Sequence, residues 1–329
     1  MVQLYSSIKD MDNQSSKTIL VTGAAGFIGS HAVDRLLTEG HRVIGIDNLK
    51  RGTLANLKEA LSNSQFTFIE HDIQESQAMQ EVLHDVLKDG FDCVWHLAAN
   101  SDIQKGVEDP GVDLKDTFMT TFHTLALMKR YGATELVFAS TSAIYGERAD
   151  LLSEDSGPFF PISNYGAMKL ASEASISAAL ESFLEKVWIF RFPNVVGSRA
   201  THGAIYDFVQ KLKVNSSVLT VLGDGTQVKP YLHVSELLEA MFFCIKKSQE
   251  RLNYFNIGQS GSRSTVAFMA ETVRNAVSPE AEILYTGGDR GWIGDVPQFE
   301  LSIEKIGRLG WKPQMSSDEA VERAVAECI

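Results

Sequence analysis

The chain has 329 residues, 44% of them hydrophobic and 22% charged, and a formal net charge of -12 at pH 7. This composition is typical of a water-soluble globular protein, and the negative charge disfavours a protein that wraps nucleic acid. Because no apolar run is long enough to span a bilayer and the start lacks a secretory pattern, we expect no membrane contact and a cytoplasmic location. The three scattered cysteines and the unclustered histidines predict reduced thiols and no metal site.

Predicted strands and helices alternate as far as Arg191, after a polar extension at 1–16 that is expected to be loosely held. Strands are predicted at 17–22, 41–47, 65–71, 91–99, 135–140 and 186–191, and helices at 30–39, 77–88, 112–130 and 167–184. Strands that are apolar almost throughout, and that alternate with helices of this length, predict an α/β fold with a doubly wound parallel sheet.

The regular alternation ends after Arg191. Segments rich in Gly, Ser, Asn and Asp then separate shorter helices, which are predicted at 204–213 and 234–247. We therefore expect a large α/β domain at 17–191 and a smaller α/β domain mainly at 192–329, with some later segments returning to the large sheet.

A glycine-rich turn formed by Gly23, Gly26 and Gly29 connects the first predicted strand to the first helix. Glycines let the backbone approach a pyrophosphate, whose charge is stabilised at the helix N-terminus, so the turn predicts dinucleotide binding. Asp47 ends the second strand, where its carboxylate would accept from a ribose 2'-hydroxyl and repel a 2'-phosphate, which favours NAD over NADP. We interpret the neighbouring Lys50 and Arg51 as solvated loop residues.

Other candidate ligand-binding residues lie where further strands end, which is where ligands bind in open parallel sheets. They are Asp72, Ile73, Leu97, Ala98 and Ala99, and the hydroxyl residues Ser140, Thr141 and Ser142. A hydroxyl within the run 140–142 could form a hydrogen bond to a substrate oxygen. Each group taken alone also fits an ordinary strand end or turn.

Tyr165 and Lys169 are four residues apart at the start of a predicted helix, so their side chains share one face. A lysine ammonium near a phenol favours the phenolate, and could lower the tyrosine pKa towards working pH for general acid or base catalysis. The same spacing also occurs on ordinary helix faces, so the pair gains meaning only beside the glycine turn and Asp47.

Taken together, these segments resemble the extended short-chain dehydrogenases/reductases. Matching motifs occur in the family's order at 22–29, 95–99, 140–146, 165–169, 191–194 and 222–227. The resemblance covers about residues 17–325 and is greatest to the nucleotide-sugar epimerase/dehydratases of the UDP-glucose 4-epimerase type. It implies a Rossmann-type sheet, an NAD cofactor, a nucleotide-diphosphate sugar substrate, and a homodimer formed through the long helix around 117–130 and the helix after Lys169.

The resemblance also implies roles for individual residues. Tyr165 matches the catalytic base, Lys169 the residue that binds the nicotinamide ribose and lowers the tyrosine pKa, and Thr141 the catalytic Ser/Thr, with Ser142 as the alternative. The cofactor-binding residues are Gly23, Gly26, Phe27, Ile28, Gly29, Asp47, Asn48, Asp72, Ile73, Leu97, Ala98, Ala99, Ser140, Tyr165, Lys169 and Pro193. The substrate-binding residues are Ser142, Asn194, Lys229, His233 and Arg290.

Three positions depart from the family pattern. Thr117 stands where the long helix usually has Asn, and Lys229 replaces an Arg, which keeps the charge but loses bidentate geometry on a diphosphate. Trp292 stands close to where an Arg often occurs, which bears on the role of Arg290. All three changes concern the handling of substrate.

The residues after Thr141 bear on the choice of reaction. In the family's 4,6-dehydratases an acid pair follows the catalytic Thr, whereas here Ser142 and Ala143 follow, and neither shuttles a proton as a carboxyl group does. The leading hypothesis is an NAD-dependent nucleotide-sugar 4-epimerase that oxidises sugar C4 transiently. The alternatives are a nucleotide-sugar 4-dehydrogenase or ketoreductase, and a non-catalytic dinucleotide-binding scaffold on the same fold.

Overall fold

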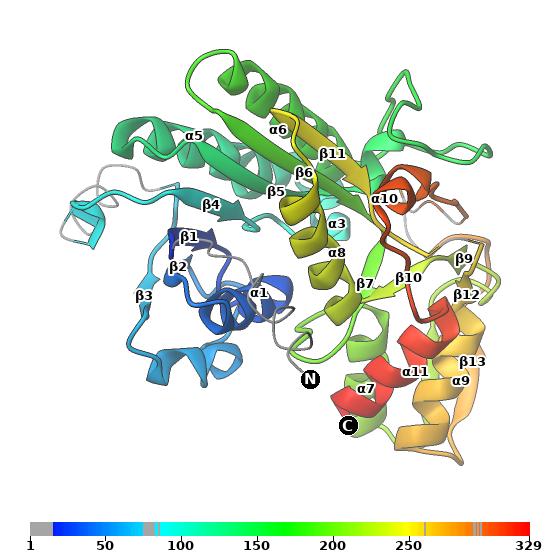
Figure 1. Ribbon diagram of the computed structural model, residues 1–329. Helices are drawn as coiled ribbons and strands as arrows, with labels where there is room; N and C mark the ends of the chain where they lie inside the picture. Colours follow the sequence, from blue (N-terminus) through cyan, green and yellow to red (C-terminus); the bar gives the residue numbers. More distant parts are fainter. Residues whose placement is uncertain are drawn as a thin grey trace, which may run out of the picture.

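The computed structural model describes residues 16–74, 83, 84, 86–259, 261–291, 294, 296 and 298–329. Its centre is a seven-stranded parallel sheet with the strand order β11-β6-β5-β4-β1-β2-β3 (Figure 1). The strands are β1 (Thr18–Thr22), β2 (Arg42–Asp47), β3 (Phe66–Glu70), β4 (Cys93–His96), β5 (Glu135–Thr141), β6 (Lys186–Phe192) and β11 (Leu252–Asn256). The predicted doubly wound α/β sheet is confirmed.

Both faces of the sheet are covered by helices, which explains why its strands are apolar almost throughout. Along β1, Leu20 packs in one core and Val21 in the other, as successive strand residues point to opposite faces. The helices α1 (Phe27–Thr38) and α8 (Val234–Lys247) cover the first face, and α5 (Thr120–Tyr131) and α6 (Asn164–Leu180) cover the second. The extension predicted before residue 16, and most of the helix predicted at 77–88, lie outside the described residues.

The long helix predicted at 112–130 is not uniform. It begins with α4 (Pro110–Asp113), continues as a π-helical segment, η3 (Leu114–Met119), and then becomes α5. A π segment adds one residue to a turn and is often found at functional sites. Here it includes Thr117, whose Oγ1 accepts a hydrogen bond of 3.1 Å from the backbone N–H of Asn100.

The C-terminal segments form a smaller layer beside the sheet (Figure 1). A core of its own joins α7 (Ala204–Val214), α9 (Val266–Val277) and α11 (Ser317–Cys328) to β8 (Val218–Val221). Two-stranded sheets pair β13 (Glu282–Tyr285) with β8, β10 (Tyr231–His233) with β7 (Asn194–Val196), and β12 (Ser264–Thr265) with β9 (Val228–Lys229). The short helices α3 (Ile103–Glu108), α10 (Glu304–Leu309), η1 (Leu54–Leu57), η2 (Ala60–Ser62) and η4 (Ser142–Tyr145) complete the described elements.

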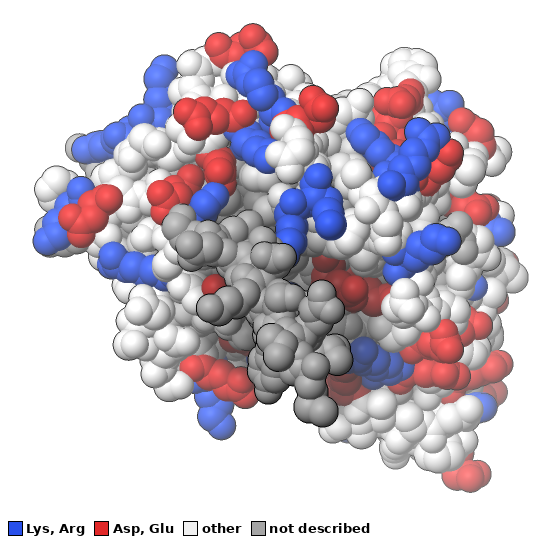
Figure 2. Space-filling model, in the orientation of Figure 1, with Lys and Arg blue, Asp and Glu red and all other residues white. Residues whose placement is uncertain are grey.

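The surface is charged, and the helices of the described residues are those of a protein without a membrane-spanning helix among them. Acidic and basic side chains are interspersed over the face in Figure 2. None of the helices in the described part of the chain has the length and apolar character that crossing a membrane requires.

Candidate active site

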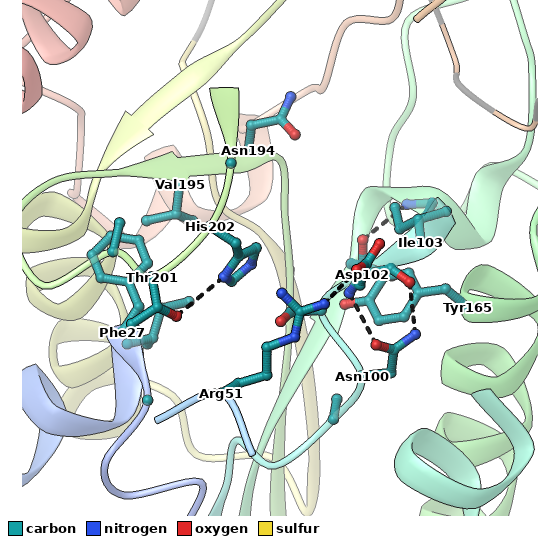
Figure 3. Close-up of a pocket in the computed structure, with 18 of the residues that line it drawn as sticks. Phe27, Arg51, Asn100, Asp102, Ile103, Tyr165, Asn194, Val195, Thr201 and His202 are labelled. Carbon is teal, nitrogen blue, oxygen red and sulfur yellow. Dashed lines mark hydrogen bonds and ion pairs between the residues drawn. The ribbon is translucent and has the colours of Figure 1, made fainter. Parts of the chain in front are cut away.

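A cavity of about 1060 Å³ opens at the carboxyl ends of the parallel strands, next to the C-terminal segments (Figure 3). Its volume is at the upper end of what small-molecule sites usually offer. Eighteen of the predicted site residues line it: Gly23, Gly26, Phe27, Ile28, Gly29, Asp47, Asn48, Asp72, Ile73, Leu97, Ala98, Ala99, Thr141, Ser142, Tyr165, Pro193, Asn194 and Lys229. The fold therefore brings these widely separated residues to one place.

The glycine turn at the end of β1 forms one wall of the cavity. Gly23 has a φ of +71°, and a Cβ on Gly29 would lie 1.9 Å from the Gly23 carbonyl oxygen, so both positions require glycine. Gly26 is the N-cap of α1 and supplies no side-chain cap, while Phe27 and Ile28 of the first turn line the cavity. A helix N-terminus that opens into a cavity in this way fits the diphosphate of a dinucleotide.

The carboxylate of Asp47 holds this turn in place. Its Oδ2 accepts from the Ala25 N–H at 3.0 Å and its Oδ1 accepts from the Leu49 N–H at 2.8 Å. Burial raises the pKa of Asp47, and these backbone bonds oppose the rise. Next to it, the Asn48 Nδ2 donates to Asp72 Oδ2 at 3.0 Å, so polar groups at the ends of β2 and β3 are linked. This edge has the acceptors that a ribose requires.

Thr141, Tyr165 and Lys169 lie where β5 meets α6. Ser163 caps α6 by accepting from the Gly166 N–H at 3.1 Å, so the helix begins before the predicted residue 167 and includes Tyr165 in its first turn. The side chains of Thr141 and Tyr165 both line the cavity, and the Thr141 Oγ1 accepts from the Ala143 N–H at 3.1 Å. Lys169 is 2% exposed, its Nζ donates to the Ala139 carbonyl at 2.6 Å, and it lies 6.0 Å from the Tyr165 ring centroid.

The pKa values of this group differ from the expectation in one respect. Burial raises the pKa of Tyr165, while the hydrogen bond from Thr141 opposes the rise. Burial lowers the pKa of Lys169 to about 7, and Glu173 opposes that change. The pKa of Tyr165 is thus raised and not lowered as expected, because burial of the phenol is the largest cause and the Lys169 Nζ bonds to the Ala139 carbonyl. Lys169 instead titrates close to neutral pH.

A buried ionic network, which was not predicted from the sequence, lies behind these residues. Glu173 accepts from the Ser140 hydroxyl at 2.5 Å and from Arg191 through Nη2 at 2.7 Å and Nε at 3.0 Å. Arg191 in turn donates to the Tyr145 hydroxyl at 3.1 Å. Ser140, which was predicted to bind the cofactor, thus directs its hydroxyl to Glu173 and is absent from the described lining of the cavity. Glu173 and Arg191 are charged residues in otherwise largely apolar segments, and this pattern in the sequence could have indicated a buried ion pair.

Two predicted substrate-binding residues also lie outside the described lining of the cavity. His233 is buried as the N-cap of α8, with Nδ1 2.7 Å from the Ser235 hydroxyl and Nε2 3.1 Å from Glu327 Oε2. Arg290 forms an ion pair of 2.7 Å with Glu147. Trp292, the departure noted near Arg290, is outside the described residues.

Arg51, which was interpreted as a solvated loop residue, lies in a loop and has 34% of its side chain exposed. Its side chain lines the cavity, and its Nη2 lies 2.5 Å from Asp102 Oδ2 (Figure 3). Lys50 also has acidic partners, since its Nζ lies 3.1 Å from Asp72 and 3.6 Å from Asp116, although half of its side chain is exposed. The carboxylates of Asp72, Asp102 and Asp116 reach this loop through tertiary contacts, so the sequence around residues 50 and 51 does not reveal these partners.

The chain is similar to known proteins along most of its length. The profile of the NAD dependent epimerase/dehydratase family matches residues 19–258. A Methanocaldococcus jannaschii protein with the provisional name UDP-glucose 4-epimerase is 31% identical, over 93% of this chain and 97% of its own length. UDP-glucuronic acid decarboxylase 1 of Arabidopsis thaliana is 30% identical over 94% and 69%. The solved structure of UDP-glucose 4-epimerase from Thermotoga maritima with UDP-glucose is 30% identical, has a TM-score of 0.81, and aligns over 94% of this chain and 98% of its own.

Proposed function

Because the chain belongs to the NAD dependent epimerase/dehydratase family, we propose that it is a nucleotide-sugar 4-epimerase. Its cofactor is NAD, which when bound accepts a hydride from the sugar carbon and returns it. The observation that carries the proposal is that Thr141 and Tyr165 line one cavity with the glycine turn at the N-terminus of α1 and with Asp47. A hydroxyl pair beside a dinucleotide site is suited to the oxidation of an alcohol.

Each of the three residues has a task in this reaction. Tyr165 takes the proton of the sugar 4-hydroxyl and later returns it, and Thr141 holds the same oxygen by a hydrogen bond. Lys169, when protonated, stabilises the phenolate through its positive charge. The sugar turns about its diphosphate linkage between the two transfers, so that the new C–H bond forms on its opposite face. The nucleotide stays anchored during this rotation.

The proposed substrate is a UDP-sugar. The Thermotoga maritima relative was solved with UDP-glucose, and Asn194 and Lys229 of this chain line the C-terminal side of the cavity. Lys229 supplies a positive charge for a diphosphate at that side. The volume of about 1060 Å³ supports a site that holds a nucleotide sugar in addition to a dinucleotide.

The second candidate is a UDP-glucuronic acid decarboxylase, which the similarity to the Arabidopsis thaliana enzyme favours. It would use the same hydroxyl groups to oxidise C4 and would then lose CO₂ from the substrate. A 4-dehydrogenase or ketoreductase would stop after one transfer. A 4,6-dehydratase is disfavoured because Ser142 and Ala143, without a carboxyl group, follow Thr141.

A panel of nucleotide sugars tests the proposal. Purified protein with NAD is incubated with UDP-glucose, UDP-galactose, their N-acetylated forms and UDP-glucuronate, and the products are identified by NMR while NADH absorbance and CO₂ are recorded. We expect a 4-epimer without net NADH or CO₂. A UDP-pentose with CO₂ would instead establish the decarboxylase, and a stable ketone with accumulating NADH would establish the dehydrogenase.

We further propose a homodimer that forms through the long helix and α6. Leu114 and Phe122 of the long helix are 50% and 53% exposed, which supports an apolar contact with a second copy. Sedimentation at micromolar concentration should give twice the mass of the chain. A single monomer species would contradict this assembly.

A further inference from the structure

The feature that the proposed function leaves unexplained is the Arg51–Asp102 ion pair. Arg51 comes from the loop after β2, and Asp102 from the loop after β4. Because β1 lies between β2 and β4 in the sheet, the pair joins two loops on either side of the glycine turn that ends β1. Figure 3 shows Arg51 between Phe27 and His202 on one side and Asp102 and Tyr165 on the other.

The loop that carries Arg51 is fixed to the glycine turn. The Ala25 carbonyl accepts from the Thr53 N–H at 3.1 Å and from Asn56 Nδ2 at 3.0 Å. A Cβ on Gly52 would lie 2.7 Å from the Ala25 carbonyl carbon, so this backbone passes directly against the turn. The guanidinium therefore extends over the cavity from a base that is fixed next to the proposed diphosphate site.

Asp102 is anchored equally well on the other side. Its Oδ1 caps α3 by accepting from the Lys105 N–H at 3.2 Å, which leaves Oδ2 for Arg51. The Asn100 side chain bonds to both the N–H and the carbonyl of Asp102, at 3.0 and 2.8 Å. Although burial raises the pKa of Asp102, the bonds from the Lys105 N–H and Arg51 lower it below its ordinary value, so the carboxylate is charged at neutral pH.

We propose that the Arg51–Asp102 ion pair closes over bound NAD and retains it, as a part of the cofactor site distinct from the glycine turn. The two groups meet across the cavity between the residues that fit the diphosphate and Tyr165, which is the span that a dinucleotide crosses. The pair must open before the cofactor leaves. Fixed bases on both sides reduce the entropy lost on closure, which makes the contact more effective than an ordinary surface pair.

Retention of the cofactor by this ion pair also bears on the reaction, a point that rests on the proposed function. An epimerase must keep the reduced cofactor until the hydride has been returned, whereas a dehydrogenase must release it. A closed ion pair over the cofactor is useful to the first and a hindrance to the second. Retention of NAD itself is independent of any sugar and is tested without one.

The test measures release of a fluorescent etheno-NAD from loaded protein after dilution into excess NAD. Arg51→Gln and Asp102→Asn should each release it about 5 to 20 times faster than the wild type, because each removes one charge of the pair. Asn keeps the cap of α3, since it caps helices as well as Asp. The double variant should be no faster than the faster single variant, as expected for two residues that act through one contact.

Arg308→Gln is the matched control, because it breaks an exposed Arg–Glu pair on α10 and should leave the release rate unchanged. Slower release from Asp102→Asn would overturn the proposal, since Arg51 would then bind the diphosphate directly and Asp102 would compete for it. Unchanged release from Arg51→Gln, or equal release from all variants and the control, would overturn it as well. Failure of the sugar panel leaves these rates untouched, so the two proposals fail separately.

Discussion

The side chains of Thr141 and Tyr165 line the same cavity, although one residue ends β5 and the other lies in the first turn of α6. Ser142, the alternative to Thr141, lies in η4 and also lines the cavity. Thr141→Val should lower kcat about 10²-fold, because a hydroxyl that holds the reacting oxygen is lost. Ser142→Ala should stay within about threefold of wild type, since the Thr141 hydroxyl and the Tyr165 phenol both remain. The reverse order of effects would assign the role to Ser142.

Tyr165→Phe removes the phenol but keeps the ring. We expect kcat for epimerisation to fall by about 10²–10⁴-fold, the range of a lost general acid or base, with NAD affinity unchanged. Steady-state rates and a direct NAD titration measure the two quantities separately. A near-normal rate would remove Tyr165 from the mechanism.

Lys169 makes the stability of the NAD-free protein depend on pH. Its pKa is about 7 in the folded protein against an ordinary value of 10.5, so between these values the unfolded chain binds one more proton than the folded one. The free energy of unfolding should then rise with pH in this window, by up to about 1.4 kcal/mol per pH unit relative to Lys169→Met. Below pH 7 both states are protonated and the two curves should run parallel. Urea unfolding of both proteins from pH 6 to 10 measures the difference, and parallel curves throughout would contradict it.

Glu173→Gln should destabilise the fold. The side chains of Glu173 and Arg191 are 8% and 7% exposed, so loss of the carboxylate leaves a buried guanidinium without its ionic partner. The expected cost is about 3 kcal/mol in the free energy of unfolding. The double variant Glu173→Gln, Arg191→Gln should lose less than the sum of the two single variants, because it contains no unpaired charge. Additive losses in urea unfolding would show that the two residues act independently.

Gly29 of the glycine turn and Gly307 of α10 should respond differently to substitution by alanine. Gly29→Ala would place a Cβ 1.9 Å from the Gly23 carbonyl oxygen and should cost about 3 kcal/mol of stability together with NAD binding. Gly307→Ala in α10 meets no atom within 4 Å and should be neutral or stabilise by up to about 1 kcal/mol. Thermal unfolding and NAD titration of both variants check this. Normal NAD binding by Gly29→Ala would show that the turn tolerates a side chain.

The fold could be predicted from the sequence because its strands are buried on both faces. Leu20 and Val21 point into different cores, so a parallel strand reads as a continuous apolar run and is hard to mistake. The ends of elements were less predictable. The start of α6 depends on the Ser163 cap, and the π segment around Thr117 has no recognisable sequence period.

The candidate site could be predicted only where its residues are close in sequence or end a strand. Tyr165 and Lys169 share a helix face by spacing alone, and Gly29 belongs to a local turn. The Arg51–Asp102 contact depends on two loops that meet only because β1 separates β2 from β4 in the sheet. The His233 side chain could in principle bind a substrate, but here it caps the N-terminus of α8. Side-chain direction in loops and caps is set by tertiary contacts, which a single sequence does not display.

Because β11 pairs with β6, the seven-stranded sheet cannot be completed until a late segment of the chain has been synthesised. Five residues of β11 add to β6, and the Ile257 N–H then bonds to the Arg191 carbonyl. Until residue 256 has left the ribosome, β6 is an unpaired sheet edge of the kind that joins strands of other chains. A fragment that stops at Arg191 would expose this edge and lack α8, so it should aggregate. The seven-stranded sheet is therefore complete only after the chain has been made as far as β11, which follows α7 and α8 in the sequence.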